Sequence, residues 1–172
     1  MDNALRELYQ EVILDHSRHP RHYGVLGDAS HKAEGYNPLC GDRVTVMLAL
    51  DEDGRVADIK FEGKGCAISQ ASASMMTDMI VGKTVSEAMG ISGAFLELMQ
   101  SRGAAEPDED LLGDAVAFEG VSKYPARIKC ALLGWMAWKD ATARALGSQA
   151  GESQAGSAVP ADSSATESRD DR

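Results

Sequence analysis

The sequence has few of the residues that define several common classes of protein. Aromatic residues make up only 5% of its 172 residues, and it contains only three cysteines and five prolines. Three cysteines, an odd number, are poorly suited to the disulfide framework of a secreted protein. We therefore expect reduced thiols that serve as buried hydrophobic groups, metal ligands or a nucleophile.

Basic residues are also scarce, because 17 Lys and Arg stand against 27 Asp and Glu, for a formal net charge of −10. Nucleic acids and anionic membranes attract proteins through a basic field, so this balance argues against both kinds of partner. No run of about 18 apolar residues indicates a membrane span. The N-terminal residues also lack the basic and apolar regions of a signal peptide. We expect a cytoplasmic protein.

The composition changes near Gly147. Residues 1–147 are long enough for one domain with its own hydrophobic core. Residues 148–172 are rich in Ser, Ala, Gly and acidic residues and contain no aromatic residue, so we expect a disordered tail. The tail holds five acids and two bases, which leaves 22 acids and 15 bases in the domain. The acidity therefore belongs mainly to the predicted domain.

Apolar periodicity predicts the secondary structure. Apolar side chains spaced by three and four residues predict a surface helix over residues 3–17. Alternating apolar and polar residues predict a β-hairpin formed by Val44–Leu50 and Val56–Phe61. The other expected elements are a weak strand over 30–36, helices over 67–80, 85–99 and 125–146, a loop over 101–110 and a short mixed segment over 111–121.

Three histidines, His16, His19 and His22, occur at a spacing of three near the end of the first predicted helix, with Arg18 and Arg21 between them. This cluster is compatible with a metal site or with a solvated basic helix end, where cationic side chains interact favourably with the helix dipole. We favour the solvated helix end, which would also provide a local basic surface for docking.

The turn Asn37-Pro38-Leu39-Cys40-Gly41-Asp42 places a thiol and a carboxylate two positions apart across a glycine. Proline and glycine are typical of turns, where side chains are accessible to solvent. The spacing lets the Cys40 sulfur and an Asp42 oxygen point toward the same place. Cys40 and Asp42 are therefore candidate chelating ligands.

The other two cysteines are predicted to lie on helices. Cys66 follows a glycine-rich junction and opens a predicted helix, whose free N–H groups and dipole favour a thiolate. Cys130 also lies near a predicted helix start, and the positive charges of Arg127 and Lys129 would favour its thiolate. Each cysteine taken alone also fits a small buried hydrophobic residue.

Together Cys40, Asp42, Cys66 and Cys130 provide three thiolates and one carboxylate. This set suits Zn²⁺ in a tetrahedral site, or iron bound through sulfur and one oxygen. The gaps of 26 and 64 residues between the cysteines match no compact zinc-finger spacing. The residues alone therefore leave a shared metal site open.

Four motifs spread over residues 3–146 resemble the IscU/NifU N-domain family of iron–sulfur cluster assembly proteins. The motifs are Tyr9…Asp15-His16…Pro20-Arg21, Asn37-Pro38-Leu39-Cys40-Gly41-Asp42, Phe61-Glu62-Gly63-Lys64-Gly65-Cys66-Ala67-Ile68-Ser69…Ala71-Ser72-Ala73-Ser74-Met75-Met76, and Tyr124-Pro125-Ala126-Arg127-Ile128-Lys129-Cys130. The resemblance implies an α+β, SufE/NifU-like fold with a small antiparallel sheet of about three strands packed against helices. It also implies that Cys40, Asp42, Cys66 and Cys130 gather at one exposed end.

Within that family the chain resembles the SufU branch more than the classical scaffold branch. Lys129 occupies the position before the last cysteine, where the scaffold branch typically has a histidine. The segment 124–129 replaces the chaperone-binding motif Leu-Pro-Pro-Val-Lys of the scaffold branch. Residues 95–121 resemble the insertion that is characteristic of SufU.

The resemblance to SufU implies a role in iron–sulfur cluster biogenesis. Zinc would be bound by Cys40, Asp42, Cys66 and Cys130. Cys40 would accept sulfur from the persulfide of a pyridoxal-phosphate cysteine desulfurase of the SufS type and pass it to the downstream Fe–S assembly machinery. We expect Arg127 to stabilise the released thiolate or persulfide, with a surface salt bridge as the alternative role.

Three other functions remain open for the same residues. The four ligands would also serve a scaffold on which iron or an Fe–S cluster is assembled and handed on. They would equally form a structural zinc site without chemistry. A cysteine hydrolase fits less well, because none of the four histidines lies in a recognisable catalytic-triad context.

Overall fold

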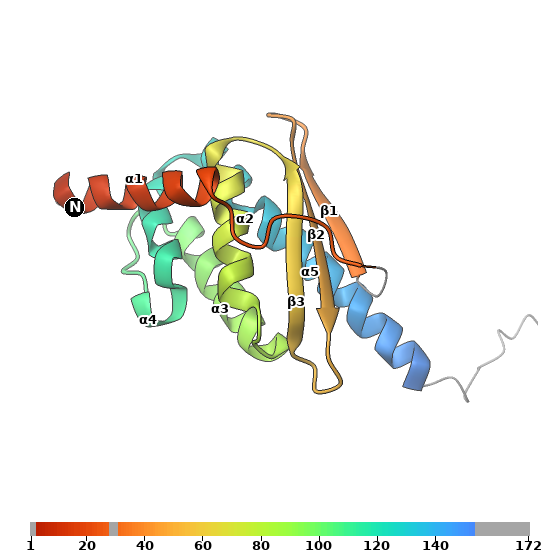
Figure 1. Cartoon of the computed structure of the whole chain (residues 1–172). Helices are drawn as coiled ribbons and strands as arrows, with labels where there is room; N and C mark the ends of the chain where they lie inside the picture. Colours follow the sequence, from red (N-terminus) through yellow and green to blue (C-terminus); the bar gives the residue numbers. More distant parts are fainter. Residues whose placement is uncertain (1–2, 28–30, 154–172) are drawn as a thin grey trace, which may run out of the picture.

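The computed structural model describes residues 3–27 and 31–153, with the backbone alone at 148–153. A three-stranded antiparallel sheet carries helices on one of its faces (Figure 1). In chain order the elements are α1 (Asn3–Arg18), β1 (His31–Asn37), β2 (Asp42–Leu50), β3 (Val56–Lys64), α2 (Ala67–Ile80), α3 (Val85–Gln100), α4 (Glu109–Leu112), the 3-10 helix η1 (Gly113–Lys123) and α5 (Pro125–Ser153). The predicted α+β fold is confirmed.

The sheet has the order β1-β2-β3, so each strand pairs with its neighbour in the chain. Val44, Val46 and Leu48 of β2 are fully buried on the face that meets the helices. The hairpin register pairs Asn37 with Asp42. Because β2 then pairs with β3 in the antiparallel sense, the start of β2 lies beside the end of β3. The β1–β2 turn and the β3–α2 junction therefore share one end of the sheet.

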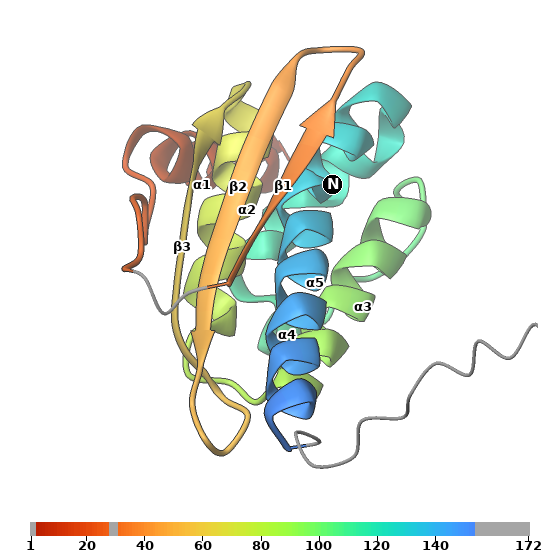
Figure 2. The same ribbon diagram turned by 90° about the vertical axis from the view of Figure 1, so that its right-hand side faces the viewer.

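The long helix α5 packs across β1 and β2 and forms the centre of the core (Figure 2). Its Trp135 ring stacks on Phe95 of α3, with the ring centroids 4.6 Å apart. Phe118 of η1 contacts Phe95 edge to face at 5.8 Å. The segment 111–121, which the sequence left as short and mixed, thus folds as a 3-10 helix because its apolar residues pack into this aromatic cluster.

Helix α5 ends at Ser153, past the predicted domain boundary at Gly147. Residues 154–172 of the predicted tail lie outside the described residues. In the described part of the chain, every helix is too short or too polar to cross a lipid bilayer.

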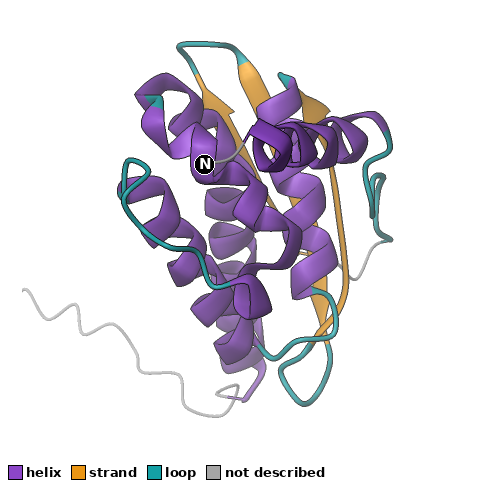
Figure 3. Ribbon diagram, turned by 90° about the vertical axis from the view of Figure 1, so that its left-hand side faces the viewer, coloured by secondary structure: helices purple, strands orange, loops and turns teal. Residues whose placement is uncertain are grey.

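The helix α1 lies across the other helices and contacts α2 and η1 (Figure 3). Its His16 side chain is only 2% exposed, whereas the sequence predicted a solvated position. The Nε2–H of His16 donates to the Asp114 carboxylate at 3.1 Å, and its Nδ1 accepts from the Ser74 hydroxyl at 2.8 Å. His16 therefore joins α1, α2 and η1, and the prediction of a fully solvated histidine cluster is wrong at this residue.

We expect His16→Ala to lower the free energy of unfolding by about 2–3 kcal/mol, because it removes two hydrogen bonds and leaves the buried Ser74 hydroxyl without its acceptor. Asp114→Ala should cost less than about 1 kcal/mol, because the Asp114 side chain is 62% exposed. Denaturant unfolding monitored by circular dichroism measures both. His19→Ala, at a side chain 77% exposed, is the matched control and should change little. Equal losses for His16→Ala and His19→Ala would contradict the structural role of His16.

Candidate metal and thiol site

The turn between β1 and β2 presents Cys40 to solvent. The Asn37 side chain accepts a hydrogen bond from the Leu39 N–H at 3.1 Å, and the Asn37 carbonyl accepts one from the Gly41 N–H at 2.8 Å. Gly41 has φ of +76°, a left-handed conformation that strongly favours glycine. The turn therefore closes directly onto Asp42, the first residue of β2, and leaves the Cys40 thiol accessible.

Cys130 on α5 reaches the same place from the opposite side. Its Sγ atom lies 3.7 Å from Cys40 Sγ, and both thiols are free. The sulfur atoms of Cys40 and Cys130 and a carboxylate oxygen of Asp42 all lie within 4.8 Å of one another. Cys40 is exposed, whereas Cys130 and Asp42 are buried. Three residues from two separate segments, the β1–β2 turn and α5, thus meet at one point.

Cys66 joins the site through its backbone. It is the N-cap residue of α2, and its N–H donates to the Asp42 carboxylate at 3.2 Å. The Asp42 carboxylate therefore lies against the start of α2, where free N–H groups favour negative charge. The Cys66 Sγ atom lies 3.9 Å from Ser69 Oγ and is not within 4.8 Å of all three other ligand atoms. The structure thus brings Cys40, Asp42 and Cys130 together, and the Cys66 thiol lies next to this group, near Asp42 and Cys130.

Gly65 makes the close approach of Asp42 to α2 feasible. A Cβ atom at this position would overlap Ser69 Oγ and would lie 3.1 Å from both Asp42 Cγ and Oδ2. Any other residue would push the carboxylate or the Ser69 hydroxyl away. The glycine before Cys66 is therefore part of the site.

Burial alone would raise the pKa of Asp42, but hydrogen bonds from the Cys66 N–H and from nearby Cys and Ser side chains outweigh it. The Asp42 pKa is consequently below its usual value, and the carboxyl is ionised at neutral pH. An ionised carboxylate is an oxygen ligand for a cation.

Cys130 differs from the sequence-based expectation. Burial, followed by the neighbouring Cys40 and Cys66 thiols, raises its pKa above the usual value, so Arg127 and Lys129 do not keep the metal-free thiol ionised. Cys130 is also the sixth residue of α5, beyond the first four residues whose N–H groups are free. A buried thiol with two other thiols beside it favours its neutral form unless a cation compensates for the charge.

The Ser72 hydroxyl holds the helix of Cys66 against the helix of Cys130. It donates to the Ala131 carbonyl at 2.6 Å and accepts from the Trp135 indole N–H at 3.0 Å. Ser72 is fully buried, so these bonds form without competition from water. Sequence reasoning missed this function of Ser72. The only available signal was the run of small residues Ala71–Ser74, which is typical of close helix packing.

Arg127 lies on the first turn of α5, and its guanidinium carbon is 4.9 Å from the centre of the Tyr124 ring. Among the described residues it makes no hydrogen bond or ion pair with the thiols or with Asp42. Its predicted role toward a released thiolate or persulfide stays a prediction.

The donor set fits a metal ion that prefers sulfur with one harder oxygen ligand. Two thiols and a carboxylate already meet, and the Cys66 thiol beside Asp42 and Cys130 is the candidate fourth ligand. The ligand set of Cys40, Asp42, Cys66 and Cys130 stays a prediction.

The fold and the site together define a small α+β domain that carries thiol and carboxylate groups at one end of a three-stranded sheet. The family model described as the NifU-like N-terminal domain matches residues 8–131. The chain belongs to this family.

Curated relatives agree with this assignment. The zinc-dependent sulfurtransferase SufU of Bacillus subtilis is 49% identical over 141 residues, which cover 81% of this chain and 92% of that protein. The iron–sulfur cluster assembly scaffold protein IscU of Streptococcus pyogenes is 43% identical, with 86% of this chain and 90% of that protein covered.

Solved structures give the same result. A structure described as an iron–sulfur cluster assembly scaffold protein for the SUF system (FiSufU), from Fervidobacterium islandicum, has a TM-score of 0.71 and 39% identity. The match covers 80% of this chain and 98% of that one. A NifU-like protein (N-terminal) from Brucella abortus has a TM-score of 0.73 and 29% identity, with 83% and 97% covered. The family resemblance drawn from the sequence motifs, including its SufU branch, is confirmed.

We expect Gly65→Ala to weaken Zn²⁺ binding by about tenfold or more, because the added methyl group displaces Asp42 or Ser69 from the site. Competition with a chromophoric chelator measures the dissociation constant. Gly90→Ala is the matched control, since a Cβ atom there meets nothing within 4 Å, and it should bind Zn²⁺ as wild type does. Unchanged affinity in Gly65→Ala would show that the position of Asp42 does not matter for metal binding.

Proposed function

We propose that this protein acts in iron–sulfur cluster assembly as a zinc-bound sulfur acceptor. It would take sulfur from the persulfide of a SufS-type, pyridoxal-phosphate-dependent cysteine desulfurase in the cytoplasm. One observation carries this proposal: an exposed thiol, Cys40, lies 3.7 Å from a buried thiol and beside an ionised carboxylate. The sulfurtransferase name of the Bacillus subtilis relative supports it.

The residues that would hold zinc are Cys40, Asp42, Cys66 and Cys130. When bound, zinc supplies positive charge that keeps thiolates ionised at neutral pH. Asp42 contributes a carboxylate that the Cys66 N–H already orients. Cys130 contributes a sulfur from a helix that Ser72 holds in place. Three of the four proposed ligands, Cys40, Asp42 and Cys130, therefore already lie within 4.8 Å of one another.

Cys40 is the residue we assign as sulfur acceptor. It lies on an exposed turn with a left-handed glycine, whereas Cys66 and Cys130 belong to helices. In the transfer step the Cys40 thiolate attacks the outer sulfur of the desulfurase persulfide and forms a new S–S bond. The original S–S bond breaks, and the desulfurase cysteine leaves as a thiolate. The persulfide thereby moves to Cys40 without any net oxidation or reduction.

Arg127 would stabilise the anionic sulfur that this exchange creates. Its exposed guanidinium lies over the Tyr124 ring, and it forms no ion pair within residues 3–27 and 31–153. A contact of this kind at an exposed site is worth about 0.5–1 kcal/mol, so a rotation of the side chain toward the thiols is inexpensive. Arg127 would then place a permanent positive charge beside the Cys40 persulfide.

A scaffold for an Fe–S cluster is the second candidate function. The scaffold name of the Streptococcus pyogenes relative favours it, and the same four residues would serve as cluster ligands. The exposed Lys129 stands where the scaffold branch typically has a histidine, and an ammonium group is not a metal ligand. This difference favours transfer of sulfur to downstream Fe–S assembly proteins.

We expect the wild-type protein to increase turnover of a SufS-type desulfurase several-fold, because Cys40 removes the persulfide from its active site. Cys40→Ala should abolish this increase, because it removes the acceptor sulfur. Release of alanine from cysteine measures turnover. Leu39→Ala, a neighbouring exposed side chain of the same turn, is the matched control and should retain sulfur acceptance. An equal stimulation by Cys40→Ala and wild type would refute transfer to Cys40.

The metal content tests the ligand set and separates the two functions. Protein purified in air should contain about one zinc and no iron, because three thiolates and a carboxylate suit zinc. Asp42→Ala should bind zinc at least about tenfold more weakly. Co²⁺ substitution should give the sulfur-to-cobalt charge-transfer absorption of three thiolates in wild type and of two in Cys66→Ser. The same absorption in Cys66→Ser would remove Cys66 from the ligands, and a colour typical of an Fe–S cluster would favour the scaffold.

A further inference from the structure

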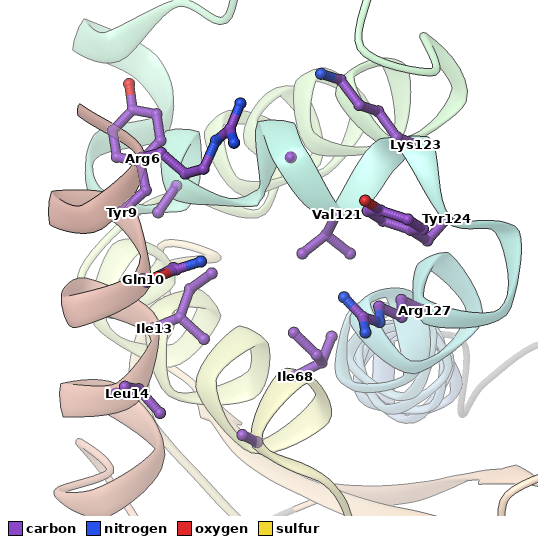
Figure 4. A pocket seen from close by; sticks show the side chains of 13 residues that line it. Arg6, Tyr9, Gln10, Ile13, Leu14, Ile68, Val121, Lys123, Tyr124 and Arg127 are labelled. Atoms are coloured by element: carbon purple, nitrogen blue, oxygen red, sulfur yellow. The ribbon is translucent and has the colours of Figure 1, made fainter. Parts of the chain in front are cut away.

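A cavity of about 580 Å³ lies beside the thiol site but is separate from it (Figure 4). The helix α1 forms one wall, η1 and the first turn of α5 form the others, and the first turn of α2 forms the floor. None of Cys40, Asp42, Cys66 and Cys130 lines it. Its volume is typical of small-molecule sites, which measure about 300–1,000 Å³.

Part of the cavity lining is apolar. Ile13 from α1, Ile68 from α2 and Val121 from η1 point into it from three sides. Ile13 and Ile68 are only partly buried, so the aliphatic surface faces the open space. An occupant with an apolar body would bury this surface, at roughly 25 cal/mol for each Å² removed from water.

The cavity also gathers positive charge in an acidic protein. Arg6, Lys123 and Arg127 line it, and no acidic side chain does. Within residues 3–27 and 31–153 none of these three cations forms an ion pair. They belong to α1, η1 and α5, so three separate elements bring unpaired cations to one cavity. On a chain with net charge −10, this arrangement favours an anionic occupant.

Acidic residues near the cavity indicate which end of it an anionic group would occupy. Tyr9 lines the α1 side of the cavity, and burial, followed by the charges of Glu109 and Glu119, raises its pKa. Those carboxylates make the Tyr9 side less favourable for an anion. Lys123 and Arg127 lie on the opposite side, where the Tyr124 hydroxyl adds a hydrogen-bond donor.

We propose that this cavity binds a small organic anion with an apolar body and a single carboxylate or equivalent acidic group. The acidic group lies on the side of the cavity formed by Lys123, Tyr124 and Arg127, with Arg6 on the α1 side. The apolar body rests on Ile13, Ile68 and Val121. Walls on three sides and a floor suit a compact molecule better than an extended acidic segment of another protein.

Binding would also affect the sulfur chemistry, and this consequence rests on the proposed function. Arg127 lines the cavity and is the residue we assign to the released sulfur anion. An anion in the cavity pairs with Arg127 and holds its guanidinium away from the thiols. The ligand would therefore reduce stimulation of the desulfurase without touching a cysteine.

The test uses two fluorescent probes of similar shape, anilinonaphthalene sulfonate and its uncharged analogue phenylnaphthylamine. The full-length protein should bind one sulfonate probe, about tenfold more tightly than the neutral probe, because charge-assisted contacts add to the apolar contact. The double variant Arg6→Gln/Lys123→Gln should lose this preference. Equal affinity for both probes in the wild-type protein would overturn the proposal.

Arg18→Gln/Lys83→Gln is the matched control, because it removes the same charge from residues outside the cavity. It should bind the sulfonate probe as wild type does, and an equal loss of affinity would show a non-specific charge effect and overturn the site. Phenylbutyrate should displace the sulfonate probe. If only an acidic peptide displaces it, the occupant is a protein segment and the small-molecule proposal fails. These measurements need no desulfurase, so their failure is distinct from failure of sulfur transfer.

Discussion

A hydrogen bond from the Cys66 N–H to the Asp42 carboxylate joins the two halves of the site. Asp42 begins β2 and Cys66 caps α2, so this bond links the hairpin turn to the helix layer. It forms because the strand register places the start of β2 beside the end of β3, and because Gly65 leaves room for the carboxylate. The ionised Asp42 then offers negative charge next to thiols that lack a compensating charge of their own.

The thiol site and the cavity carry groups of opposite charge. The thiol site concentrates groups that become anionic, whereas the cavity concentrates cations that form no ion pair among the described residues. Their common boundary is the first turn of α2 together with Arg127. The permanent positive charge of Arg127 at that boundary is available to either side, because among the described residues it stacks on Tyr124 and forms no ion pair.

The sequence predicted the structural elements that are determined by neighbouring residues in the chain. Helix α1 and the hairpin follow apolar periodicity, and the position of Cys66 at a helix start follows from the glycine-rich junction before it. The environment of His16 could not be predicted in this way, because its partners Ser74 and Asp114 lie 58 and 98 residues away. The direction of the Cys66 thiol depends on one side-chain torsion, which spacing does not encode.

The two hydroxyls of α2 face different neighbours, because Ser72 bonds to α5 while Ser74 bonds to His16 of α1. Each residue turns a helix by about 100°, so a single-residue insertion or deletion between Cys66 and Ser72 would rotate both hydroxyls away from their partners. The number of residues in this segment is therefore constrained, separately from which residues it contains. Insertions and deletions are better tolerated in residues 101–108, between α3 and α4, because this segment is not a helix whose rotation must point two side chains at their partners.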